Sequence, residues 1–154
     1  MLDIVLFEPE IPPNTGNIIR LCANTGCSLH LIEPLGFELD DRRMRRAGLD
    51  YREFAQVRVY STLEDFRRDN GQPRLFGATT HATRPYHDVS YRRGDAILFG
   101  PETRGLPANI LSSLGDAGQI RIPMRPESRS LNLSNATAVV VYEALRQLDF
   151  PGLA

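Results

Sequence analysis

The chain is poor in residues that bind metals or form disulfides. It has two cysteines and three histidines among 154 residues. Cys22 and Cys27 are separated by a spacing that fits neither a zinc site nor a disulfide framework. His81 and His87 have no cluster of carboxylates near them in the sequence. We therefore expect no bound metal, and we expect both cysteines to be buried and structural.

Long hydrophobic runs are also missing. No apolar run approaches the roughly 20 residues of a membrane span, and the first residues lack the basic and apolar regions of a signal peptide. Hydrophobic residues make up 42% of the chain and charged residues 24%, which is typical of a soluble globular protein. We expect a cytoplasmic protein that folds as one domain over residues 1–154, without a membrane partner.

Lysine is absent, so all 18 cationic side chains are arginine, and the net charge is −1. A biased genome composition explains most of this usage, and the net charge gives no sign of nucleic-acid binding. The positions of the arginines are more informative, because a local basic patch can bind a polyanion at near-zero total charge. The arginines form two clusters, Arg42, Arg43, Arg45 and Arg46, and Arg125 with Arg129. For the first cluster, the alternative is a solvent-exposed helix face that binds nothing.

Two common nucleotide-binding fingerprints are missing as well. The chain contains no Gly-x-Gly sequence and no Gly-Lys-Ser/Thr loop. This excludes the usual dinucleotide-binding and phosphate-loop motifs. A nucleotide-like ligand would have to be bound in another way.

Strand and helix patterns alternate along the chain. This alternation predicts an α/β fold with a parallel sheet that is covered by helices on both faces. The predicted strands are 2–7, 28–32, 56–60, 75–80, 96–99 and 119–122. The predicted helices are 14–25, 40–47, one from the capping sequence 61–64 to near 71, 107–114 and 133–148.

Three polar loops follow predicted strands, and they contain most of the chemistry of the sequence. They lie in the segments Pro12–Arg20, Leu98–Pro107 and Ile120–Tyr142. Ligands of open α/β sheets bind at the carboxyl ends of the strands, and free backbone N–H groups gather where a helix begins. The alternative for the third loop is ordinary helix capping by Asn132 or Ser134. Together the loops predict a site for a polar small molecule.

The three segments resemble the motifs of the SPOUT superfamily, the knotted RNA methyltransferases that use S-adenosylmethionine. The resemblance covers nearly the whole chain, from Glu8 to Leu148. Within the superfamily the chain is similar to the enzymes that methylate the ribose 2′-hydroxyl of the tRNA wobble nucleotide (position 34, cytidine or uridine). The resemblance implies a C-terminal trefoil knot, a homodimer, and the anticodon stem-loop of tRNA, leucine tRNAs in particular, as substrate.

The resemblance also implies the binding residues for the methyl donor. Their backbone groups, rather than their side chains, would hold the donor. Gly100 suits close backbone approach, and it equally suits a tight turn after a strand. The implied donor-binding residues are Ala78, Thr79, Gly100, Ile122, Met124, Ser130, Leu131 and Asn132.

Arg20 is the implied catalytic residue, with Asn14 and Glu102 as further candidates. Two roles remain open for Arg20, a proton acceptor or an electrostatic stabiliser of the developing alkoxide. For Glu102 the alternative is a structural role in holding Arg104 or the loop. The implied RNA-binding residues are Arg45, Arg46, Arg129 and Tyr142.

Two other functions are compatible with these motifs. One is a related methyltransferase that acts on another tRNA ribose or on ribosomal RNA. The other is a non-catalytic module that binds RNA or a nucleotide.

Overall fold

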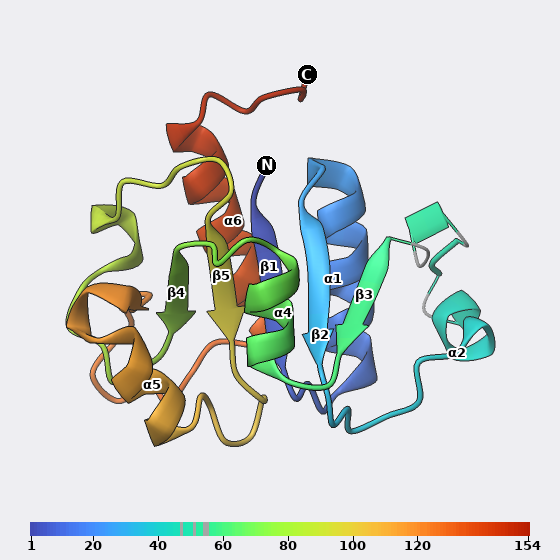
Figure 1. The fold of residues 1–154 in the computed structure, drawn as a ribbon, viewed down its shortest axis with the longest axis horizontal. Helices are drawn as coiled ribbons and strands as arrows, with labels where there is room; N and C mark the ends of the chain where they lie inside the picture. Colours follow the sequence, from blue (N-terminus) through green and yellow to red (C-terminus); the bar gives the residue numbers. More distant parts are fainter. Residues whose placement is uncertain (47, 51, 54–55) are drawn as a thin grey trace.

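The computed structural model describes residues 1–46, 48–50, 52–53 and 56–154. These residues form a six-stranded, entirely parallel sheet with the strand order β3-β2-β1-β5-β4-β6 (Figure 1). The predicted parallel α/β class is therefore confirmed. The strands are β1 (Asp3–Phe7), β2 (Ser28–Ile32), β3 (Val57–Tyr60), β4 (Leu75–Ala78), β5 (Ala96–Phe99) and β6 (Gln119–Ile120).

Helices cover both faces of this sheet (Figure 1). One face carries α1 (Pro12–Thr25) and α6 (Leu133–Gln147), which pack against each other. The other carries α4 (Leu63–Asp69) and α5 (Ala108–Leu114). The short helix α2 (Asp41–Arg46) lies beyond the β3 edge, and η1 (Tyr86–Asp88) and η2 (Asp116–Gly118) are single 3₁₀ turns. None of the helices in the described ranges is long and apolar enough to cross a membrane.

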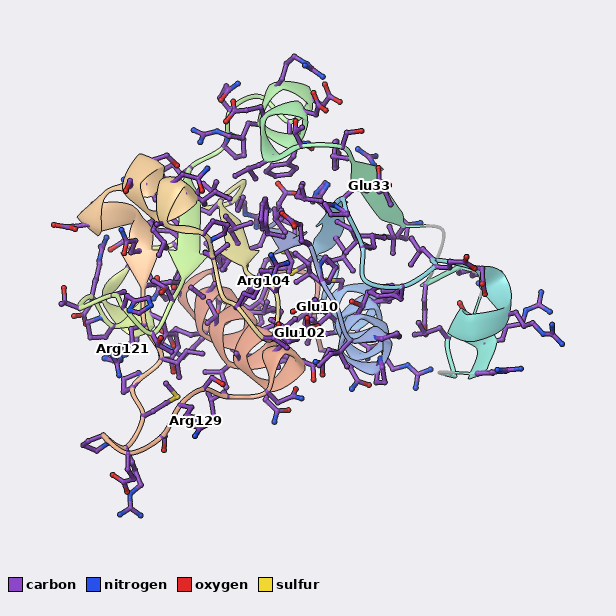
Figure 2. All side chains as sticks on the ribbon, turned by 90° about the horizontal axis from the view of Figure 1, so that it is seen from below. Glu10, Glu33, Glu102, Arg104, Arg121 and Arg129 are labelled. Atoms are coloured by element: carbon purple, nitrogen blue, oxygen red, sulfur yellow. The ribbon has the colours of Figure 1, made fainter. Side chains whose placement is uncertain are left out.

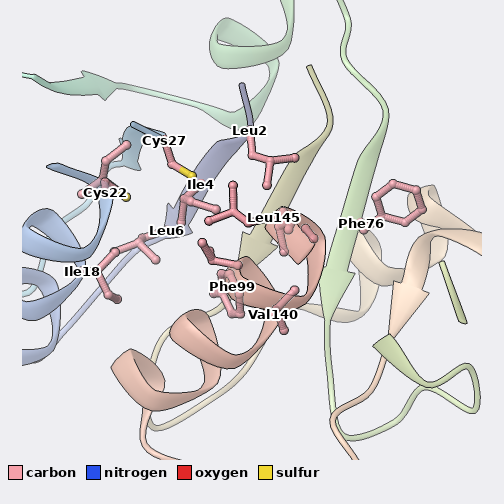
Figure 3. Packing of buried hydrophobic residues seen from close by; sticks show 14 of the residues in the cluster. Leu2, Ile4, Leu6, Ile18, Cys22, Cys27, Phe76, Phe99, Val140 and Leu145 are labelled. Carbon is pink, nitrogen blue, oxygen red and sulfur yellow. The ribbon is translucent and has the colours of Figure 1, made fainter. Parts of the chain in front are cut away.

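Alternate residues of the central strands supply two separate hydrophobic cores. Ile4 and Leu6 of β1 face the α1–α6 layer (Figure 3), whereas Val5 faces the α4–α5 layer. Cys22 and Cys27 are buried, free thiols in the first core, as expected. Burial raises the pKa of both thiols, so they remain protonated and inert.

Several element ends differ from the predicted ones. Helix α1 begins at Pro12 rather than at residue 14, because proline is tolerated where the backbone N–H has no partner in the helix. Pro107 is the N-cap of α5 and not its first residue. Strands β4 and β6 both end two residues early, and the residues that follow them are free to form loops at the sheet edge. The predicted end of α2 at Ala47 lies outside the described residues.

Candidate active site

A cleft of about 440 Å³ lies at the carboxyl edge of the sheet. Figure 2 shows the molecule from below, with this edge toward the viewer. The loops after β1, β4, β5 and β6 meet there with the start of α6. The volume lies within the range of small-molecule sites. The tertiary structure thus brings the three polar loops of the sequence to one place.

All eight residues that were predicted to bind the methyl donor line this cleft. Asn14, Glu102 and Arg129 line it too, whereas Arg20, Arg45, Arg46 and Tyr142 do not. The eight residues are Ala78, Thr79, Gly100, Ile122, Met124, Ser130, Leu131 and Asn132.

The cleft wall offers free backbone hydrogen-bonding groups. Within the described part of the chain, the backbone N–H and C=O of Ile122, Ser130 and Leu131 form no hydrogen bond. The side chain of Ile122 packs against the core, so its main chain is what it offers to a ligand. Such unpaired groups can bind the edge of a heterocycle or a ribose.

Gly100 is required by the folding of its own loop. A Cβ atom at this position would lie 2.4 Å from the backbone N of Leu106 and 2.5 Å from the carbonyl carbon of Gly105. The residues 100–106 therefore close tightly against Gly100. This geometry supports the tight-turn interpretation of Gly100 and leaves its role toward a ligand as a prediction.

Two glutamates join the loop after β1 to the loop after β5, a pairing we call the glutamate clasp. Glu102 accepts hydrogen bonds from the backbone N–H groups of Glu10 at 2.7 Å and Ile11 at 3.1 Å. Glu10 accepts in return from the N–H of Thr103 at 3.0 Å and its hydroxyl at 2.7 Å. The hydrogen bonds from Thr103 lower the pKa of Glu10. Glu102 thus holds the loop, as its structural alternative supposed, while Arg104 lies 3.6 Å from Glu8 instead.

Asn132 joins the start of α6 to the start of α1. Its Oδ1 accepts from the N–H groups of Ser134 at 2.9 Å and Asn135 at 3.3 Å, so Asn132 is the N-cap. Its Nδ2 donates to Oδ1 of the buried Asn14 at 3.0 Å. The capping interpretation of this segment is correct, and the same side chain also lines the cleft.

Arg20 lies outside the cleft of its own chain. Its side chain is 50% exposed, its Nη2 donates to the carbonyl of Gly48, and its Nε lies 3.7 Å from Oε2 of Glu53. These contacts place Arg20 beside the end of α2, where Arg45 and Arg46 are exposed. The arginine-rich helix and the predicted catalytic arginine therefore share one region of the surface.

The other two predicted RNA-binding residues are also accessible. Arg129 is exposed on the loop that lines the cleft. Tyr142 is 47% exposed on α6, and Val139, one turn before it, is 39% exposed. An apolar strip thus remains uncovered on α6.

Sequence reasoning missed two arginines and one histidine of the cleft, Arg104, Arg121 and His81. Nothing in the sequence marked Arg121 as a cleft residue, because it lies inside the predicted strand 119–122. Within the described ranges, no three or more His, Cys, Asp or Glu residues lie together where they could hold a metal ion.

Comparison with known proteins connects this geometry to a family. Residues 1–142 match the model of the SpoU rRNA methylase family. The chain is 63% identical over 157 residues to a tRNA (cytidine(34)-2′-O)-methyltransferase of Yersinia pestis, covering 99% of this chain and 97% of that protein.

Solved structures agree with this relationship. A structure described as giving insights into the 2′-OH methylation of C/U34 on tRNA matches with a TM-score of 0.87 and 41% identity, covering 97% of both chains. The SpoU methyltransferase AviRb of Streptomyces viridochromogenes, in complex with the cofactor AdoMet, matches with a TM-score of 0.80 and 25% identity. That match covers 97% of this chain and 58% of AviRb.

Proposed function

Because the chain belongs to the SpoU rRNA methylase family, we propose that it transfers a methyl group from S-adenosylmethionine to the ribose 2′-hydroxyl of tRNA nucleotide 34, a cytidine or uridine. The observation that carries the proposal is the 63% identity, over nearly the full length of both chains, to a protein named for this reaction.

The cleft suits the donor in size and chemistry. A volume of about 440 Å³ accommodates a nucleoside with an amino-acid side arm. The free backbone groups of Ile122, Ser130 and Leu131 would bind the nucleoside, in line with the backbone recognition that the resemblance implies. The donor supplies the activated methyl group, and the chain supplies position and charge.

Arg20 would act on the acceptor. A guanidinium does not readily lose its proton in proteins, so we assign Arg20 to stabilising the developing alkoxide and orienting a neighbouring phosphate. The 2′-oxygen would form its bond to the methyl carbon as the C–S bond of the donor breaks. The donor would leave as a neutral thioether, and the hydroxyl proton would pass to water. Because Arg20 does not line its own cleft, the proposed active site is composite. Arg20 of one subunit would meet the donor that is bound by the other subunit of a homodimer.

Exposed apolar residues support the dimer. Ile11, Leu131, Val139 and Tyr142 are each about two-fifths exposed or more, and they lie on or beside α1 and α6. An apolar surface of this kind commonly marks an interface. Contact between the α1–α6 faces of two copies would cover these residues and bring Arg20 toward the cleft of the partner.

The RNA would lie across this dimer. Arg45, Arg46 and Arg129 are exposed, and guanidinium groups suit phosphate contacts. Sequence-specific RNA recognition favours single-stranded loops, whose bases are accessible. We therefore propose the anticodon stem-loop as the minimal substrate, leucine tRNAs as its source, and the cytoplasm as the place of the reaction.

The proposed architecture is a single domain over residues 1–154 with a C-terminal trefoil knot. The path of β6 supports the knot. Gly77 and Ala78 of β4 pair with Gln119 and Ile120, while Arg121 is bridged to Pro85 on its other side. The chain at 119–121 thus passes between two parts of one continuous segment, 77–86.

A synthetic anticodon stem-loop tests the reaction and its position. One copy carries ribose at position 34 and a matched copy carries deoxyribose there, both incubated with labelled donor and excess chelator. We expect methylation of the ribose copy only, without added metal. Equal methylation of both copies would place the methyl group elsewhere, and loss of activity in chelator would contradict a metal-free reaction.

A further inference from the structure

Arg121 is the most firmly fixed of the cations that line the cleft. Its N–H donates to the carbonyl of Arg84 at 2.8 Å, and its own carbonyl accepts from the N–H of Tyr86 at 2.8 Å. The residue as a whole is half-buried, and its Nη1 donates to the carbonyl of Thr80 at 2.5 Å in an exposed hydrogen bond. Both the backbone and the guanidinium are therefore held in place before any ligand binds.

In the part of the chain that the structure describes, this guanidinium has no anionic partner. Other arginines, such as Arg74 with Asp95 at 2.6 Å, pair with carboxylates. Among the described residues, no carboxylate lies within ion-pair distance of Arg121. Glu102, the carboxylate that lines the cleft, already accepts two backbone N–H groups. A guanidinium that lines the cleft and has no carboxylate partner there is available to bind an anionic group of a ligand.

We propose that Arg121 binds the carboxylate of the amino-acid arm of the methyl donor, and thereby makes the cleft selective for donors that carry this group. The proposal rests on the proposed function. The donor contains one anionic group, its α-carboxylate, beside a cationic sulfonium and ammonium. A planar guanidinium fork binds a carboxylate through two parallel hydrogen bonds.

The position of Arg121 favours the small donor over an RNA phosphate. Arg121 directly precedes Ile122 and is bonded to Thr80, which follows Thr79, so it belongs to the wall that carries the predicted donor residues. Arg104, with a side chain 59% exposed, and the exposed Arg129 are open to solvent and suited to a polynucleotide backbone. The arginines of the cleft thus form two sets: Arg121 lies on the wall of the predicted donor residues, and Arg104 and Arg129 lie on the outer, solvent-exposed side.

Calorimetric titration with two ligands tests this assignment. One is S-adenosylmethionine, and the other is its decarboxylated form, which lacks only the carboxylate. We expect wild type to bind S-adenosylmethionine at least about tenfold more tightly, as a charge-assisted pair implies. Arg121→Gln should lose that preference by weakening the first ligand alone, and Arg121→Lys should retain part of it.

Arg125→Gln is the matched control, because Arg125 is 85% exposed, pairs with Glu127 and does not line the cleft. It should keep the wild-type preference. If Arg121→Gln weakens the binding of both ligands equally, then Arg121 only supports the loop at Thr80, and the proposal is overturned. Unchanged donor affinity with weakened stem-loop binding would assign Arg121 to RNA instead. Failure of wild type to bind either ligand would contradict the proposed function itself, which separates the two ideas.

Discussion

At the scale of single residues, Arg20 shows how a solvent-accessible side chain can be preorganised. Its bond to the carbonyl of Gly48 and its proximity to Glu53 restrict a long, flexible side chain, although half of it is exposed. Guanidinium groups do not readily lose their proton in proteins. A fixed, permanent cation is suited to stabilising negative charge that develops on an acceptor oxygen.

Arg20→Ala should therefore abolish methyl transfer while the donor affinity stays within a few-fold of wild type, because Arg20 does not line the cleft. Arg20→Lys should also fail, since an ammonium lacks the planar fork. Stem-loop methylation and donor calorimetry measure the two effects. Arg93→Ala, an exposed arginine that does not line the cleft, is the control and should be fully active. Near-full activity of the lysine variant would refute the role assigned to Arg20.

At the scale of elements, the site depends on hydrogen bonds between helix starts and loops that are distant in sequence. Asn132 caps α6 and binds Asn14 of α1, 118 residues away. The glutamate clasp joins residues 10 and 11 to residues 102 and 103. Each contact positions one wall of the cleft against another, so loss of either should affect stability and donor binding together.

Asn132→Ala should lower the free energy of unfolding by about 2 kcal/mol or more, since it removes a cap and leaves the buried Asn14 without its donor. Asn132→Ser keeps a cap acceptor and should cost about 1 kcal/mol less. Urea unfolding measures both. Asn135→Ala in the same helical turn is the control, with a change within about 0.5 kcal/mol. Equal losses in the Ala and Ser variants would exclude a contribution from the cap.

The clasp should weaken in acid. The pKa of Glu10 is lowered in the folded state by hydrogen bonds from Thr103, so its stabilisation is complete above the unfolded pKa and is lost as the pH falls through the folded one. Glu10→Gln should melt a few degrees below wild type at pH 7. This difference should shrink below the ordinary glutamate pKa of about 4.3.

Thermal melts of the two proteins across this pH range provide the measurement. Glu38→Gln, an exposed glutamate, is the control and should follow wild type throughout. A difference that stays constant down to pH 2 would show that the charge of Glu10 does not strengthen the clasp.

At the scale of the whole molecule, the separation of Arg20 from the cleft requires a second subunit for the proposed chemistry. In a symmetric dimer each of two identical sites would combine a cleft from one chain and Arg20 from the other. Two variants with different defects should then complement each other. Complementation is a property that no single chain can show.

We expect mixed Arg20→Ala and Gly100→Ala subunits to regain about a quarter of wild-type activity, although each variant alone is inactive. Half of the randomly exchanged dimers would be mixed, and each of these would contain one intact site. Gly100→Ala should spoil the cleft, because its Cβ would meet the backbone of Leu106. Sedimentation would verify the dimer and subunit exchange. Absence of recovery after verified exchange would contradict a composite site.

Much of the fold and part of the site followed from local sequence pattern. The bounds of β2 and β5 were predicted correctly. Strand β5 is a continuous apolar run, which is typical of a buried strand, and in β2 the apolar residues Leu29 and Leu31 flank His30. The eight cleft residues came from the resemblance to the SPOUT motifs, and they meet at one cleft because a parallel sheet places the ends of its strands at one edge.

The tertiary structure alone decided how distant side chains pair. Three sets of hydrogen bonds join segments that are far apart in the chain: the glutamate clasp, the bond between Asn132 and Asn14, and the bonds of the Arg121 backbone to Arg84 and Tyr86. The position of Arg20 outside the cleft, where it is bonded to Gly48, was also decided only by the folded chain. Hydrophobic periodicity reports which residues are buried and in what local element, since it reflects contacts with a single core. It contains no information on which polar partners meet, because that depends on strand order and on the packing of loops that only the folded chain defines.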